Sequence, residues 1–270
     1  MSFPYKTVLM VGCTAGIGLA LAERMIENGV FVIGVGRRKD RLDAFVAKHG
    51  PEKAAASQFD ITDLDGIKGW AEGIIKSYPT LDCIVLNSGI QRSLNFASPT
   101  TIDLALMQHE TTTNYTAYVY LMAAFLPHLQ SLSPRPASLV AVTSGLALVP
   151  LPRCANYCAG KAALHSLLWS ARAQLAHDPG SAHIRVVEIL PPAVRTELHS
   201  LQPDLKEAGH DDFGMPIGEF VDEAWEGLLQ GKEEVPVGFV KGRLDAFEGP
   251  RREAFKGIVG RTLGSGKVLP

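Results

Sequence analysis

The sequence predicts an α/β fold in which a doubly wound parallel β-sheet carries helices on both faces. Short runs rich in Val, Ile and Leu alternate with longer segments of helical periodicity, and no Ser-, Pro- or Gly-rich linker divides the 270 residues. The runs are apolar at consecutive positions rather than at alternate ones. Such strands need cover on both faces, which crossover helices supply. We therefore expect a single domain built around one sheet.

Seven apolar runs are the candidate strands. They occupy residues 7–12, 30–36, 54–59, 82–87, 137–144, 184–190 and 235–239. The helix-length segments between them occupy residues 16–29, 63–77, 101–129, 157–177 and 219–231. Because ligands of such sheets bind beyond the carboxyl ends of the strands, functional residues are expected just after each run.

We divide the single domain, residues 1–270, into functional parts. The cofactor-binding half spans about residues 5–130 and the catalytic and substrate-binding half about 131–240, with a polar lid at about 197–215. Residues 241–270 are expected to form a solvated C-terminal tail, because their basic residues show no other pattern.

Composition excludes several classes of protein. A net charge of −2 and a pI near 6.4 give no electrostatic footprint for nucleic acid or an anionic membrane. The longest apolar stretch, residues 117–126, is about half of a bilayer span. The four cysteines form no CxxC pair and accompany no ligand-spaced histidines, so neither a metal site nor a disulfide scaffold is expected. We expect a soluble, cytoplasmic protein.

A glycine-rich turn follows the first run. Gly12, Gly16 and Gly18 have the spacing G-x-x-x-G-x-G, and they close a strand and open an amphipathic helix. Glycine lets the chain turn sharply and lets main-chain N–H groups approach a pyrophosphate at the helix N-terminus. This context favours dinucleotide binding over simple packing and identifies the sheet as a Rossmann fold.

The end of the second run indicates which dinucleotide binds. An NAD site would need a carboxylate there for the ribose 2′-hydroxyl, but Gly36 occupies the place and Arg37 and Arg38 follow. Two guanidinium groups suit a 2′-phosphate, so the sequence predicts NADP(H). The alternative is two exposed arginines at a helix start.

Two further strand ends fit the same cofactor. Asp60 could accept a hydrogen bond from the adenine amino group, and Asn87 and Gly89 follow the fourth run. Each of these could equally serve as an N-cap or in a tight turn. The expected cofactor-binding set also includes Thr14, Ile17 and Ile61.

The candidate catalytic residues follow the central runs. Tyr157 and Lys161 are four residues apart, a spacing that chance alone could supply. Ser144 ends the fifth run thirteen residues before Tyr157, and Asn114 stands inside a predicted helix where propensity does not favour it. All four lie on elements that flank the carboxyl ends of central strands.

In this combination the chain resembles the short-chain dehydrogenase/reductase family from about residue 5 to about residue 240. The glycine pattern, Asn87-Ser88-Gly89, Asn114, Ser144, Tyr157-x-x-x-Lys161 and the segment PPAVRT occur in the family's order. The resemblance implies hydride transfer between NADP(H) and a ketone, an aldehyde or a secondary alcohol, as in carbonyl reductases and alcohol dehydrogenases. It also implies a homodimer or homotetramer.

The resemblance assigns a role to each matching residue. Tyr157 would be the general acid/base and Ser144 would hydrogen-bond the substrate oxygen. Lys161 would bind the nicotinamide ribose and Asn114 would anchor a proton-relay water. Val194 and Thr196 would meet the carboxamide end of the cofactor.

A tyrosine needs help to act as a base at neutral pH. Its ordinary pKa is near 10, and lowering that pKa by about three requires roughly 4 kcal/mol. An ammonium group about 5 Å away contributes roughly 3 kcal/mol at an effective dielectric constant of about 20. We therefore expect Lys161 to lower the pKa of Tyr157.

Three positions depart from the family pattern, namely Val11, Leu86 and Pro192. In the lid, His199 and His210 are expected to be solvated loop residues. Two other functions stay open: an NADP(H)-sensing Rossmann protein without catalysis, and a family enzyme that catalyses dehydration or epimerisation.

Overall fold

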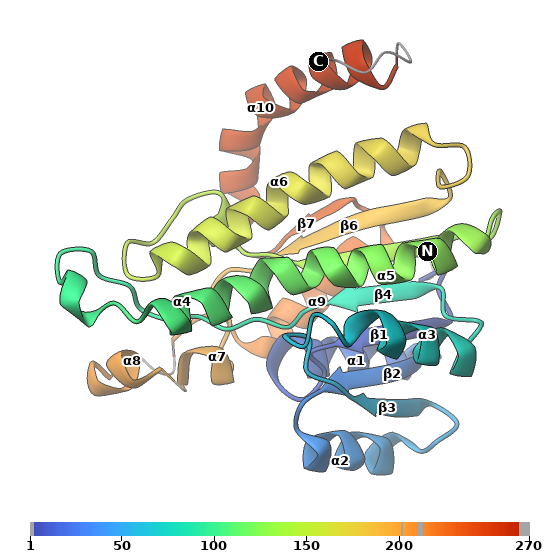
Figure 1. Ribbon diagram of the computed structural model, residues 1–270, viewed down its shortest axis with the longest axis horizontal. Coiled ribbons are helices and arrows are strands. Elements are labelled where there is room, and N and C mark those ends of the chain that lie inside the picture. Colours follow the sequence, from blue (N-terminus) through green and yellow to red (C-terminus); the bar gives the residue numbers. More distant parts are fainter. Residues whose placement is uncertain (1–2, 201, 210–212, 265–270) are drawn as a thin grey trace.

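Seven parallel strands form one sheet in the order β3-β2-β1-β4-β5-β6-β7 (Figure 1). A computed structural model of the chain describes residues 3–200, 202–209 and 213–264. The strands are β1 (Thr7–Val11), β2 (Phe31–Gly36), β3 (Ala54–Gln58), β4 (Cys83–Leu86), β5 (Ala137–Val142), β6 (Ile184–Leu190) and β7 (Glu234–Pro236). Each predicted run overlaps one of them, and the predicted single-domain Rossmann fold is confirmed.

The strand order reverses beside β1, which pairs with β2 on one side and with β4 on the other. A ligand cleft is expected at such a switch point. In the β1–β4 register Val11 lies opposite Leu86, and both side chains are buried. These two departures from the family pattern therefore fill the core beneath the cleft.

Helices cover both faces of the sheet. Side chains of α1, α2 and α9 are buried in one apolar cluster, and those of α3, α5 and α6 in a second cluster on the opposite face. These helices are α1 (Gly16–Glu27), α2 (Lys39–His49), α3 (Ile67–Ser77), α5 (Ala117–Ser131), α6 (Ala155–His177) and α9 (Ile217–Leu229). Helix α2 is absent from the predicted set, because its apolar face consists of little more than Leu42 and Phe45.

The predicted helix 101–129 is interrupted in the structure. A 3-10 turn, η1 (Pro99–Thr101), is followed by α4 (Leu104–Thr111), and Asp103 caps α4 by accepting from two main-chain N–H groups. A π-helical turn, η2 (Thr112–Thr116), then leads into α5. Turns of this kind recur at functional sites, and this one contains Asn114.

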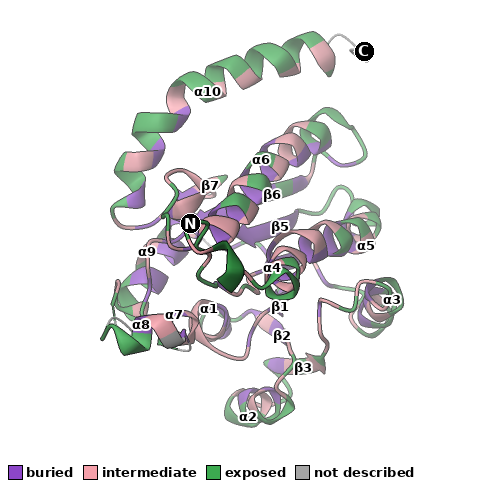
Figure 2. Ribbon diagram, turned by 60° about the vertical axis from the view of Figure 1, so that its left-hand side comes forward, coloured by how far each residue is buried: buried purple, intermediate pink, exposed green. Residues whose placement is uncertain are grey.

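The C-terminal tail, which was expected to be solvated, is mostly exposed, but Leu244 and Glu248 are buried. Residues Val240–Thr262 form the helix α10, which lies beside α6 (Figure 1). Val240, Leu244 and Glu248 are spaced one turn apart and are buried against the domain. Figure 2 shows the rest of α10 mostly exposed. Among the described residues, no helix is both long enough and apolar enough to cross a membrane.

Candidate active site

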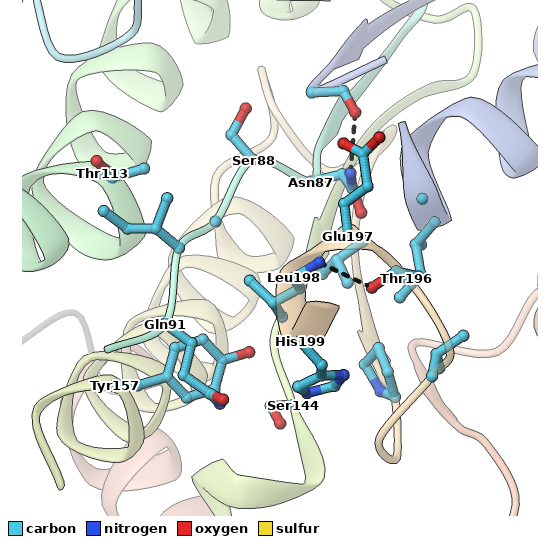
Figure 3. A pocket seen from close by; sticks show the side chains of 18 of the residues that line it. Asn87, Ser88, Gln91, Thr113, Ser144, Tyr157, Thr196, Glu197, Leu198 and His199 are labelled. Atoms are coloured by element: carbon cyan, nitrogen blue, oxygen red, sulfur yellow. Dashed lines mark hydrogen bonds between the residues drawn. The ribbon is translucent and has the colours of Figure 1, made fainter. Parts of the chain in front are cut away.

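The turn between β1 and α1 leaves no room for a side chain at Gly12 or at Gly18. A Cβ atom on Gly18 would lie 2.2 Å from the main-chain oxygen of Gly12, and a Cβ atom on Gly12 would lie 2.8 Å from the main-chain nitrogen of Ser88. Gly12 also has a positive φ of +90°. The Asn87 amide donates to the Gly12 oxygen at 3.1 Å (Figure 3). The glycines thus bring main-chain N–H groups to the floor of the cleft.

A single cavity of about 610 Å³ joins this turn to the ends of the central strands. Every residue of the predicted site except Gly18 and Asn114 lines it. Figure 3 shows Tyr157 and Ser144 at one end and Asn87 and Thr196 farther along. The structure therefore brings together residues that are spread from position 12 to position 196 of the chain.

Burial controls the protonation of Tyr157. It raises the pKa of the phenol, although a hydrogen bond with Ser144 acts in the opposite direction. Ser144 ends the loop after β5, where its hydroxyl accepts from the N–H of Leu146 at 3.1 Å. The net lowering of this pKa that the sequence predicted is therefore wrong, because burial outweighs the groups that favour the phenolate, and the phenol is protonated at neutral pH.

Lys161 is buried one helical turn after Tyr157. Its Nζ donates to the main-chain oxygen of Val142 at 2.8 Å and lies 5.6 Å from the centre of the Tyr157 ring. Burial lowers its pKa to about 8, while the carboxylate of Glu188 favours the charged form. Lys161 therefore remains an ammonium group at neutral pH.

A buried ion-pair network lies near Lys161, and it was not predicted from the sequence. Glu188 accepts from Thr143 Oγ1 at 2.5 Å and pairs with His165 Nδ1 at 2.8 Å. On the other side of the ring, His165 Nε2 lies 3.7 Å from Glu248 of α10. Burial alone would lower the pKa of His165, but the two carboxylates outweigh it and raise that pKa. The one signal in the sequence is a glutamate within the apolar strand β6.

Asn114 holds the loop that follows β4. Its Oδ1 accepts from the N–H of Ile90 at 2.9 Å, and its Nδ2 donates to the Ile90 oxygen at 2.7 Å. The residue is buried and does not line the cavity. A Cβ atom on Gly89 would lie 3.4 Å from Asn114 and 3.8 Å from Lys161 Nζ, so Asn114 and Lys161 are neighbours across Gly89.

Arginines gather where β2 ends. Arg37 lies 3.6 Å from Asp60, and Arg38 and Arg41 both pair with Glu197, at 2.7 and 2.6 Å. Arg41 was not in the predicted set, because its position within α2 gives no signal in the sequence. Asp60 also lines the cavity and accepts from the N–H and hydroxyl of Thr62. Its role in a tight turn, one of the predicted alternatives, is therefore confirmed.

The lid forms two short helices, α7 (Glu197–Ser200) and α8 (Pro203–Glu207). Arg153, which lies just before α6, holds α8 in place by donating to both carboxylate oxygens of Asp204, at 2.7 and 2.8 Å. Many apolar residues also line the cavity, together with the further arginines Arg92, Arg153 and Arg243. The apolar lining includes Leu146, Leu151, Leu198, Leu205, Phe213 and Phe239.

The sequence predicted that His199 is a solvated loop residue, and this prediction is wrong. His199 is buried against Phe213, with ring centroids 4.6 Å apart, and it lines the cavity (Figure 3). Burial lowers its pKa, and its Nδ1 has no hydrogen-bond partner among the described residues. The structure therefore places a neutral imidazole in the wall of the cavity, next to Phe213. His210 lies outside the described residues.

The chain is similar to known proteins in sequence and in fold. The sequence profile of the family described as short chain dehydrogenase matches residues 6–205. The chain belongs to the short-chain dehydrogenase family. An uncharacterized oxidoreductase of Bacillus subtilis, DltE, is 38% identical to this short-chain dehydrogenase, and the match covers 91% of this chain and 93% of that protein.

The name of one further relative states an activity, and the description of a similar solved structure states a bound cofactor. The benzil reductase ((S)-benzoin forming) IRC24 of Saccharomyces cerevisiae is 31% identical, over 75% of each chain. A short-chain dehydrogenase from Sphingobium yanoikuyae, solved in complex with NADPH, is 28% identical, with a TM-score of 0.78 over 93% of this chain and 95% of that one. This protein is thus an oxidoreductase of the short-chain dehydrogenase family, whose members act on small molecules.

Proposed function

We propose that the protein is an NADPH-dependent reductase of ketones or aldehydes, and in the reverse direction a dehydrogenase of secondary alcohols. One observation carries this proposal: Ser144, Tyr157 and Lys161 line the same cavity as the glycine-rich turn. Family membership adds support, because the tyrosine, lysine and serine stand in the family's order.

The nicotinamide supplies the hydride, and the protein must deliver a proton to the oxygen that becomes the alcohol. Tyr157 is the proposed donor, since its phenol is protonated at neutral pH and hydrogen-bonds Ser144. Ser144 is the proposed partner of the substrate oxygen. Lys161 places a positive charge that stabilises the phenolate left behind. Asn114 contributes by holding the main chain of Ile90 beside the reaction centre.

The residues at the arginine end of the cavity fit NADP(H). Gly36 carries no carboxylate, and a Cβ atom there would lie 2.6 Å from Thr14 Cγ2, so an acidic residue would collide. Arg37 and Arg38 line the same end, as a 2′-phosphate requires. Val194 and Thr196 line the cavity and are proposed to contact the carboxamide. The NADPH complex of the Sphingobium relative supports this choice.

Turnover with identified products tests the proposal. NADPH oxidation should be followed across ketones, aldehydes and quinones, with NADH in parallel, and each product should be identified. An alcohol product formed faster with NADPH is the expected result. Dehydrated or epimerised products would favour the biosynthetic alternative. Tight NADPH binding without turnover of any compound would favour a sensing protein.

We propose a homodimer or homotetramer located in the cytoplasm. Leu104, Leu106 and Tyr120 of α4 and α5 are exposed apolar side chains that a second copy could cover. The apolar residues of α6, such as Leu164 and Leu168, are instead buried in the core and are not available for pairing. The four free, buried thiols suit a reducing compartment. Light scattering measures the oligomeric state.

A further inference from the structure

Glu197 pairs with two of the three arginines at the end of the cavity where a 2′-phosphate would bind. One carboxylate oxygen lies 2.7 Å from Arg38 Nη1, and the other lies 2.6 Å from Arg41 Nη1. The two guanidinium groups lower the pKa of Glu197, so it is ionised at neutral pH. All three side chains are 36–40% exposed, which leaves them open to a competing ligand.

The ion pair joins two elements on opposite sides of the cleft. Arg38 and Arg41 belong to the segment after β2, whereas Glu197 begins α7 of the lid, directly after Thr196. Arg38 is further held by Thr14 of the glycine-rich turn, whose Oγ1 accepts from Nη2 at 2.8 Å. The guanidinium of Arg38 is therefore fixed beside the pyrophosphate-binding turn.

Charge arithmetic explains why Glu197 matters for the cofactor. Arg38 and Arg41 together carry two positive charges, and Glu197 reduces the sum to one. A 2′-phosphate carries between about 1.5 and 2 negative charges near neutral pH. It must therefore share the arginines with Glu197 or displace it. A 2′-hydroxyl carries no charge and has no such competition.

We propose that Glu197 occupies Arg38 and Arg41 in the place of the cofactor 2′-phosphate, so that it weakens NADP(H) binding and links that binding to release of the lid helix α7. The inference rests on the proposed function, because it requires that NADP(H) binds in this cavity. It adds Glu197 and Arg41 to Arg37 and Arg38, the two residues from which the sequence predicts NADP(H).

Calorimetric binding of NADPH and of NADH to Glu197→Gln tests the proposal without measuring activity. The variant should bind NADPH roughly fivefold more tightly, because a half-exposed ion pair of about 1 kcal/mol no longer competes. Its affinity for NADH should stay within about twofold of wild type, since no phosphate is involved. Glu207→Gln is the matched control: it removes a lid carboxylate that is exposed, and it should change neither affinity.

Arg41→Gln is a second test of the proposal. In this variant Glu197 still pairs with Arg38, and the 2′-phosphate loses one arginine that could bind it. This variant should weaken NADPH binding several-fold and leave NADH binding unchanged. Unchanged or weaker NADPH binding by Glu197→Gln overturns the inference, as does an equal gain for NADH. If wild type binds NADPH and reduces a carbonyl compound while Glu197→Gln behaves like wild type, only this inference fails. If wild type binds no NADPH, the proposed function fails with it.

Discussion

The Nζ atom of Lys161 lies 5.6 Å from the centre of the Tyr157 ring and 2.8 Å from the main-chain oxygen of Val142. Both side chains are buried and lie on one face of α6, one turn apart. The lysine is thus held by β5 and not by the phenol. The charge of Lys161 can therefore act on Tyr157 although Lys161 does not accept the phenol proton. Burial then decides the protonation of each residue.

Lys161→Met should abolish turnover and at the same time stabilise the fold. Keeping an ammonium group buried is unfavourable, as its pKa of about 8 shows. We expect the free energy of unfolding at pH 7 to rise by about 1–2 kcal/mol, after the lost hydrogen bond to Val142 is counted. Urea denaturation measures this difference.

The pH dependence of stability is a second test of whether burial lowers the pKa of Lys161. Its folded pKa lies below the unfolded value of about 10.4, so the unfolded chain binds more protons between pH 8 and that value. Wild type should therefore gain stability relative to the variant as pH rises through this window. A variant less stable than wild type at pH 7 would contradict the burial argument.

Reduction by the wild-type enzyme should slow as pH rises through about 8, where Lys161 loses its proton. In Glu188→Gln the decline should begin at lower pH, because the Glu188 carboxylate favours the charged lysine. The profile of kcat/KM against pH, measured for both proteins, tests this. A decline at the same pH in both would show that Glu188 does not act on Lys161.

His165→Gln should destabilise the protein, and more strongly at pH 6 than at pH 9. The folded pKa of His165 is raised, so its stabilising effect is complete below the unfolded value of about 6.5 and is lost as pH rises through the folded pKa. We expect a loss of about 3 kcal/mol at pH 6, since Glu188 and Glu248 lose a buried partner. Chemical denaturation at the two pH values measures this loss of stability.

The exposed control His177→Gln should change stability by less than about 0.5 kcal/mol at either pH. An equal loss at both pH values would mean that His165 is uncharged.

Gly18→Ala should remove dinucleotide binding, because its Cβ atom would lie 2.2 Å from the Gly12 oxygen and 2.4 Å from the Asn87 amide nitrogen. The matched control is Gly73→Ala, in the middle of α3, where a Cβ atom meets nothing within 4 Å. That change should stabilise the protein by about 0.5–1 kcal/mol. Calorimetric NADPH binding and thermal unfolding of both variants test the pair. Wild-type affinity in Gly18→Ala would refute the close packing of the turn.

The strands and the glycine-rich turn could be predicted because their signals are local. A buried parallel strand is a continuous apolar run, and Gly12 and Gly18 are set by the shape of one turn. Helix α10 was missed because its buried residues are only one per turn, and one of them is Glu248. An acidic side chain predicts an exposed position, but Glu248 is buried beside His165.

The contacts that tune the candidate site could not be predicted, because their partners are far apart in sequence. Glu197 meets Arg41 across 156 residues, and Glu188 reaches Thr143 across 45. His199 looked like a solvated loop residue, and only the packing of Phe213 against it shows that it is buried. The candidate catalytic set rests on residue types and spacing, whereas the protonation of Tyr157 depends on burial.

Tyr157→Phe tests the central claim most directly. The phenol oxygen is the only atom removed, and Ser144, Lys161 and the glycine-rich turn keep their positions. With a ketone or aldehyde that the wild type reduces, kcat should fall by at least about 100-fold, the usual contribution of a positioned acid. The dissociation constant for NADPH, measured by calorimetry, should stay within about twofold of wild type. A kcat equal to that of wild type would contradict the role of Tyr157 as proton donor.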